Sequence, residues 1–152
     1  MYIEINNKYR PYIAQWLLVM FFLVSIMIII GGLTRLTDSG LSITEWEFFK
    51  GFFPPMSKST WIEYFEAYKR IPEFQLQNFS MSLSEFKVIF WWEWFHRFFG
   101  RLIGLCFLLP LIYFSFKIRL INLLHYYLIF LLICFQGFIC LLYTSDAADE
   151  SV

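Results

Sequence analysis

The stretch Tyr12–Ile30, YIAQWLLVMFFLVSIMIII, decides how this chain folds. It contains no charged residue, and Gln15 and Ser25 are its only clearly polar members. A helix of this length measures about 28 Å, close to the hydrocarbon core of a bilayer at about 30 Å. The stretch therefore predicts a transmembrane helix. A signal peptide is the competing interpretation, which we disfavour because the following GGLTRLTDSG lacks a small-residue cleavage site.

The composition of the whole chain is typical of a membrane protein. Its 152 residues are 59% hydrophobic, 23% aromatic and 16% charged, whereas soluble domains average about 45–50% apolar and about 25% charged residues. These proportions exclude a disordered chain and a nucleic-acid-binding protein with a basic face. The three cysteines lie in apolar runs without metal-ligand spacing, so we interpret them as small buried hydrophobic residues.

Two further apolar segments follow the first. Residues 88–116 are longer than a bilayer requires and include four ionisable side chains near their beginning, so this helix projects beyond the membrane or enters it within a bundle. Residues 120–142 form the third segment. The expected fold class is an all-α integral membrane protein with three transmembrane helices.

A long polar and aromatic loop, residues 31–87, separates the first two segments. Gly31 and Gly32 are expected to end the first helix. Within the loop, Lys58–Arg70 mixes charged and aromatic residues at helical spacing, which predicts a short interfacial helix. One face of this helix would carry Trp61, Tyr64, Phe65 and Tyr68.

The basic residues predict the orientation of the helices. Lys8 and Arg10, and also Lys117 and Arg119, lie in short segments that are poor in acids, as cytoplasmic segments are. The N-terminus is therefore expected in the cytoplasm and the long loop outside. No transit-peptide pattern precedes the first helix, which favours a bacterial inner membrane over a mitochondrial one.

The last ten residues, 143–152, differ in composition from the rest of the chain. All 12 Lys and Arg precede them, whereas Asp146, Asp149 and Glu150 lie among them. We interpret residues 143–152 as a non-native tail from a truncated or chimeric reading frame, with a natural outer tail as the alternative.

The stretch Trp91–Arg101, WWEWFHRFFGR, carries the residues capable of chemistry. Glu93 and His96 are three positions apart and share a helix face, and Arg97 and Arg101 lie one turn apart. Ionisable residues in a membrane helix are costly and usually mark a site, a cavity or a pathway. A histidine among Phe and Trp is a candidate axial ligand for haem iron, and arginines suit haem propionates.

Other interpretations of this stretch stay open. Glu93 can simply pair with Arg97 near the lipid headgroups, at little cost, or it can act with His96 in a proton relay. A di-iron site needs a second ExxH copy and further carboxylates, but the chain has only two histidines. The other one, His125, is expected to be an interfacial side chain near the cytoplasmic end of the third helix.

Three blocks of the sequence resemble one known family. The blocks are Gly31–Ser42 (GGLTRLTDSGLS), the loop run from Pro54-Pro55 through Pro72-Glu73-Phe74, and Ser84–Gly104 (SEFKVIFWWEWFHRFFGRLIG). Together they resemble the first part of haem A synthase, the cytochrome oxidase assembly enzyme, in the form without loop cysteines. The resemblance extends in register over about residues 12–140.

The resemblance implies a fold, an activity and site residues. Members have eight transmembrane helices in two four-helix halves, so the three helices here would belong to one half-bundle. They oxidise the C8 methyl group of haem O to a formyl group with water as the oxygen source, and a haem b in the C-terminal half passes electrons. Glu93 matches the family's essential glutamate, and His96 matches a histidine that ligates the iron of the substrate haem. Arg35, Arg97 and Arg101 are candidates for propionate contacts, with lipid headgroups as the alternative.

The resemblance also implies partners. These are haem O, the lipid bilayer, haem O synthase with other cytochrome oxidase assembly factors, and a second copy in a homo-oligomer; nucleic acid is not expected. Residues 1–142 lack the family's fourth helix and C-terminal half, so we expect an N-terminal fragment that is inactive alone. A non-catalytic haem-binding assembly protein and a structural membrane fragment without a ligand are the alternative interpretations.

Overall fold

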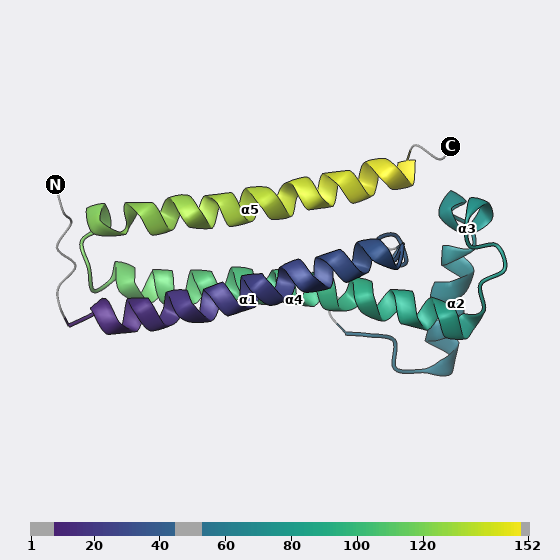
Figure 1. Ribbon diagram of the computed structural model, residues 1–152, viewed down its shortest axis with the longest axis horizontal. Coiled ribbons are helices and arrows are strands. Elements are labelled where there is room, and N and C mark those ends of the chain that lie inside the picture. The colour runs from purple at the N-terminus through teal and green to yellow at the C-terminus, as the bar shows by residue number, and fades with distance from the viewer. Residues whose placement is uncertain (1–7, 45–52, 150–152) are drawn as a thin grey trace. The chain divides into compact units, whose positions relative to one another are not determined.

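The computed structural model describes residues 8–44 and 53–149, with side chains described up to residue 140. Within these ranges the regular structure is entirely helical, which confirms the expected all-α fold class. The helices in chain order are α1 (Arg10–Leu36), α2 (Lys58–Tyr68), α3 (Pro72–Leu76), α4 (Leu83–Ser115) and α5 (Leu120–Asp149) (Figure 1).

Three helices of the described part are long and apolar enough to cross a membrane. They are α1, α4 and the portion of α5 from Leu120 to Cys140. With 27 and 33 residues, α1 and α4 exceed the length of about 20 residues that a bilayer requires. The expectation of three membrane-spanning helices is therefore confirmed by length and composition. The tail residues 143–149 extend α5 as helix, and their interpretation as non-native stays a prediction.

The expected end of the first helix at Gly31 and Gly32 was wrong. α1 continues through both glycines to Leu36, and neither glycine has a positive φ. A glycine costs a helix only about 1 kcal/mol relative to alanine, which is too little to stop a long apolar helix. The chain leaves the helix instead at Asp38, whose φ of 46° is left-handed, a conformation that aspartate tolerates better than most residues.

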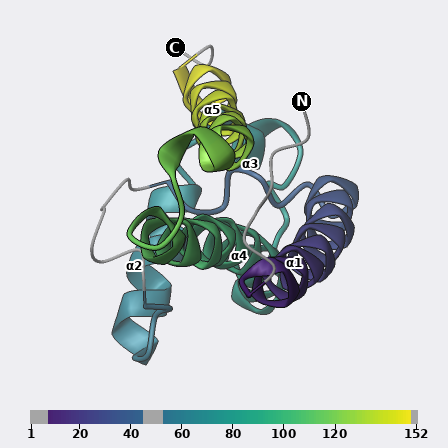
Figure 2. The ribbon, with the colours of Figure 1, turned by 90° about the vertical axis from the view of Figure 1, so that its left-hand side faces the viewer.

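The first of two compact units contains the described residues of the α1 region up to Ile28, together with Phe99–Cys140 of α4 and α5. Figure 2 looks onto the end of this unit at which α1 begins. Apolar side chains from all three helices bury one another there, which gives the unit a core of its own. Its buried members are Ile13, Trp16, Met20, Ile103, Phe107, Leu111, Phe114 and Leu123.

Trp16 in this core supplies a hydrogen bond that α4 lacks. Pro110 lies inside α4 and has no N–H, so it cannot donate to the carbonyl of Cys106, four residues earlier. The indole Nε1 of Trp16 donates to that carbonyl over 2.9 Å. Because lipid offers no water to satisfy a carbonyl, a proline within a membrane helix depends on such a substitute donor.

The second compact unit contains the described residues of Ile29–Phe98 and those that follow Cys140. Its core joins α2 to the beginning of α4: the rings of Trp61 and Phe90 lie 5.0 Å apart, and those of Tyr68 and Phe86 lie 5.1 Å apart. The predicted aromatic face of α2 is confirmed, since Trp61, Phe65 and Tyr68 are buried and Tyr64 packs against them. The interfacial position of α2 stays a prediction.

Candidate functional site

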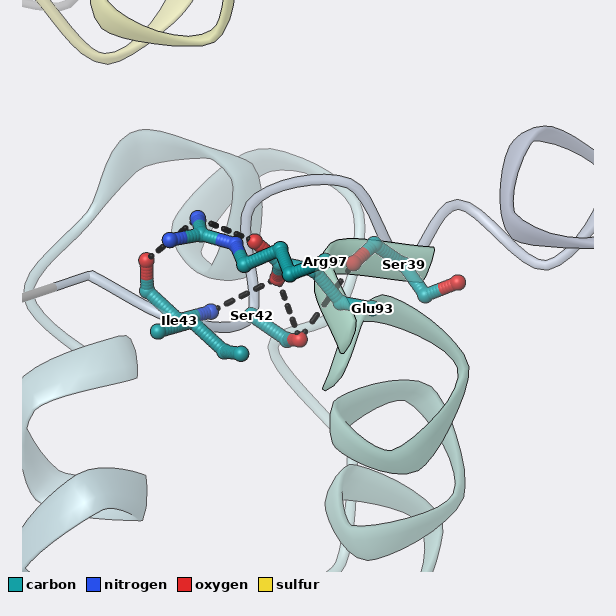
Figure 3. Close-up of polar contacts among 5 residues, drawn as sticks. All are labelled: Ser39, Ser42, Ile43, Glu93 and Arg97. Atoms are coloured by element: carbon teal, nitrogen blue, oxygen red, sulfur yellow. Dashed lines mark hydrogen bonds and ion pairs between the residues drawn. The ribbon is translucent and has the colours of Figure 1, made fainter. Parts of the chain in front are cut away.

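Glu93 is the buried acid at the centre of the site. It lies on α4 with an exposed fraction of only 3%. Ser42 Oγ and the backbone N–H of Ile43 donate hydrogen bonds to its Oε2 over 2.7 and 2.8 Å, and Arg97 forms an ion pair with its Oε1 (Figure 3). Burial of a charged group is tolerated when the charge is both paired and hydrogen-bonded, and Glu93 meets both conditions.

The segment that follows α1 brings these donors to Glu93. Ser39 turns back on the end of the helix, with its backbone N–H and its Oγ both donating to the carbonyl of Thr34, over 3.1 and 3.0 Å. This turn places Ser42 and Ile43 against α4. Arg97 Nη2 also donates to the carbonyl of Ile43 over 3.3 Å, so the arginine holds both the acid and the segment that covers it.

His96 lies one turn beyond Glu93 on α4 and is half-buried. No described residue forms a hydrogen bond with its imidazole ring. A Cβ atom built on Gly31 of α1 would lie 3.5 Å from its Nε2 and 3.6 Å from its Cδ2. The edge of the ring that carries Nε2 therefore faces a stretch of backbone without a side chain.

The imidazole of His96 is chemically suited to bind the iron of a haem. An imidazole nitrogen without a hydrogen-bond partner among the described residues can donate its lone pair to iron, although α1 packs closely against its Nε2 at Gly31. On another face of α4, Trp94 and Phe98 stack with their ring centroids 5.2 Å apart. Among the described residues, the buried Nε1 of Trp94 has no hydrogen-bond partner, although such groups normally have one.

The three candidate arginines have different environments. Arg97 is committed to Glu93 and to Ile43. Arg35 is exposed in the last turn of α1, within the same unit as Glu93 and His96. Arg101 is half-buried and belongs to the other compact unit.

Two parts of this site were not predicted as such. Ser42 and Ile43 lie at the end of the SGLS block, and no local pattern indicated that they would contact Glu93. Glu73 of α3 is half-buried, and its Oε2 is buried without a hydrogen-bond partner in the described part of the chain. Burial, followed by the negative charges of Glu93 and Asp38, raises the pKa of Glu73 from 4.5 to about 7. A lone acid after Pro72 in an aromatic loop was the only available signal.

A sequence model of the family described as Cytochrome oxidase assembly protein matches residues 14–145, which include Glu93, His96 and the segment that covers them. This chain belongs to that family. No solved structure matches it.

Curated relatives agree with this membership in the cytochrome oxidase assembly family. The chain is 52% identical over 136 residues to Heme A synthase of Pelagibacter ubique, covering 88% of this chain and 40% of that relative. It is 54% identical over 112 residues to Heme A synthase of Parvibaculum lavamentivorans, covering 74% and 33%. It is 50% identical over 112 residues to Heme A synthase of Bradyrhizobium diazoefficiens, covering 74% and 31%. The resemblance stated from the sequence is confirmed, and this chain spans 40% or less of the length of these relatives.

Proposed function

We propose that this chain forms the substrate site of a haem A synthase, which oxidises the C8 methyl group of haem O to a formyl group with water as the oxygen source. One observation carries the proposal. A buried and hydrogen-bonded carboxylate, Glu93, lies one helical turn from His96, whose imidazole has no hydrogen-bond partner among the described residues. Membership in the family and the names of the relatives support haem as the substrate class.

In this proposal His96 positions the substrate. Its Nε2 would bind the haem iron. Because the iron is at the centre of the porphyrin, this bond would set how far each edge of the ring lies from His96. Arg35 and Arg101 are the candidates for propionate contacts. Arg97 is a third candidate, and Glu93 and Ile43 also engage it.

Glu93 is proposed to act on the methyl group. Conversion of a methyl group and one water to a formyl group releases four electrons and four protons; the electrons pass to a redox cofactor of the haem b class, which the resemblance places outside this chain. A carboxylate beside the methyl carbon stabilises positive charge that develops there and can accept a released proton. Three of the roughly four acceptor positions of a carboxylate are occupied in Glu93, so one position stays available for this role.

The decisive experiment uses the protein expressed from its full gene in a host that makes haem O. Glu93→Ala should abolish haem A while haem stays bound, as measured by chromatography of extracted haems. His96→Ala should instead reduce the haem retained by the purified protein. Glu63→Ala is the control, because Glu63 is exposed on α2. A normal yield of haem A from Glu93→Ala would refute the catalytic role.

A second candidate function is non-catalytic haem binding during assembly. It is favoured by the ion pair between Glu93 and Arg97, since an acid already paired and covered can act as a structural anchor. Bound haem without any haem A, in the wild-type protein as well as in Glu93→Ala, would favour this function.

We also propose that the protein lies in a bacterial inner membrane with its N-terminus in the cytoplasm, alongside haem O synthase and other assembly factors and as a homo-oligomer. The basic residues near the start of α1 and between α4 and α5 support the orientation, and the bacterial sources of the relatives support the membrane. In a cysteine-free background, an impermeant thiol reagent added to cells with a permeabilised outer membrane should label Lys58→Cys and not Lys8→Cys. The reverse pattern would invert the topology.

We further propose that residues 143–152 are not native to this protein. Their acidic composition, against the basic excess of the preceding chain, supports this. Sequencing of the source gene across codon 141 should show a frame that continues into a fourth apolar segment. A frame that ends after Val152 would contradict it.

A further inference from the structure

The two oxygens of the Glu93 carboxylate have different surroundings (Figure 3). Oε2 accepts hydrogen bonds from the hydroxyl of Ser42 and the backbone N–H of Ile43, over 2.7 and 2.8 Å. Among the described residues, only Arg97 donates to Oε1. An ionised carboxylate offers about four acceptor positions, two on each oxygen. Both positions of Oε2 are therefore filled, and the position that stays available belongs to Oε1.

We propose that Ser42 is a positioning residue, whose hydroxyl fixes the Glu93 carboxylate so that Oε1 is the oxygen that acts on the substrate. The inference rests on the proposed function, because it requires Glu93 to accept a proton there. One of the four protons that the oxidation releases forms an O–H bond on Oε1, and Glu93 becomes neutral. The electrons leave separately, to the redox cofactor of the haem b class.

The donors on Oε2 are what distinguish the two oxygens of Glu93. The last torsion of a glutamate side chain is broad and roughly two-fold, so its partners decide which oxygen faces which way. Arg97 alone does not distinguish the oxygens, because either can pair with a guanidinium. The hydroxyl of Ser42 and the N–H of Ile43 come from one segment and converge on one oxygen. Of these two donors, only the hydroxyl can be removed by a change of side chain.

The burial of this contact makes the hydroxyl hard to replace. Ser42 has an exposed fraction of 1% and Glu93 of 3%, so bulk water does not reach the contact. Ser39, in the same turn, is also fully buried, but its hydroxyl donates to the carbonyl of Thr34 over 3.0 Å. The chain thus offers two buried serines close in sequence, of which Ser42 contacts the acid and Ser39 holds the backbone.

The test compares Ser42→Ala, Ser42→Thr and Ser39→Ala in the protein expressed from its full gene in a host that makes haem O. Haem A is divided by the total haem retained in the purified protein, so that protein lost to misfolding does not count. We expect Ser42→Ala to lower this ratio about tenfold or more with normal haem retention, because a misplaced carboxylate costs turnover and not binding. Ser42→Thr keeps a hydroxyl and should recover most of the loss.

The matched control separates positioning from support of the fold. Ser39→Ala removes a buried hydroxyl from the same turn, but the backbone N–H of Ser39 still donates to Thr34. It should lower the unfolding temperature and keep the ratio of the wild type. The inference is overturned if Ser42→Ala keeps the same ratio as Ser39→Ala, or if Ser42→Thr makes no more haem A than Ser42→Ala. Normal haem A from Glu93→Ala would show that the proposed function itself has failed.

Discussion

The hydroxyl group of Ser42 donates a hydrogen bond to Oε2 of Glu93 over 2.7 Å, across 51 positions of sequence. The same hydroxyl lies 3.3 Å from the carbonyl of Ser39, and since it has one proton, the shorter contact to the carboxylate takes it. The segment after α1 and the first third of α4 are thus joined around one buried acid. Substitutions in this segment are therefore expected to affect Glu93.

Ser42→Ala should destabilise the protein by about 1–3 kcal/mol, because it removes a donor from a buried carboxylate. Thermal unfolding in detergent measures the change. Ser25→Ala is the control, since the exposed Ser25 hydroxyl donates only to the carbonyl of Phe21 in its own helix, and its effect should stay within about 0.5 kcal/mol. Equal unfolding temperatures for the two variants would show that the contact with Glu93 contributes nothing.

Glu93 and Arg97 should show strong energetic coupling. Glu93→Gln or Arg97→Gln alone removes one half of the ion pair around the buried Glu93 and should cost about 3–5 kcal/mol, whereas the double variant should cost much less than the sum. Glu66 of α2 and Lys69, which follows the helix, form a comparison pair with exposed side chains, at 2.7 Å. Coupling in that pair should be at most about 1 kcal/mol. Additive effects of the two substitutions at 93 and 97 would contradict the structure.

Glu73 should make the stability of the protein fall as the pH rises. Burial, with the charges of Glu93 and Asp38, raises its pKa to about 7 in the folded protein, above the value of about 4.3 in an unfolded chain. The folded state therefore holds this proton more tightly. Its contribution to stability is complete below about pH 4 and is lost as the pH passes through 7. Because Glu73 is only half-buried, solvent screening limits the loss to about 1–2 kcal/mol.

The variant Glu73→Gln should reduce this pH dependence. Unfolding temperatures measured between pH 5 and pH 8 should decline less in Glu73→Gln than in the wild type. Glu63→Gln, which changes an exposed acid, should keep the wild-type slope. If the unfolding temperature of Glu73→Gln falls with pH as steeply as that of the wild type, the raised pKa of Glu73 is wrong.

Trp16→Phe should destabilise the protein by about 1–3 kcal/mol, because the carbonyl of Cys106 then loses its donor. Pro110→Ala restores an N–H at the position from which α4 would normally donate to this carbonyl. In the Pro110→Ala background, Trp16→Phe should therefore cost clearly less. Thermal unfolding of the four proteins tests this, and an equal cost in both backgrounds would exclude the substitute-donor role.

Much of the fold could be predicted because its signals are local. The uncharged run of Tyr12–Ile30 and the apolar runs after it correspond to helices long enough to span a bilayer. The aromatic face of α2 followed from helical spacing and is confirmed by burial. The end of α1 was mispredicted because a pair of glycines weakens a helix without breaking it. Turn chemistry at Asp38 ends it instead.

The sequence by itself determined three long apolar helices, a short aromatic helix and a shared face for Glu93 and His96. The last follows because residues three positions apart on a helix are neighbours on its surface. Only the tertiary structure decided that Ser42 and Ile43 cover Glu93, that Trp16 replaces the missing donor of Pro110, and that Gly31 lies beside His96. The physical reason is that these contacts join segments tens of positions apart. Their partners are selected by the packing of whole helices, which no local pattern of residues records.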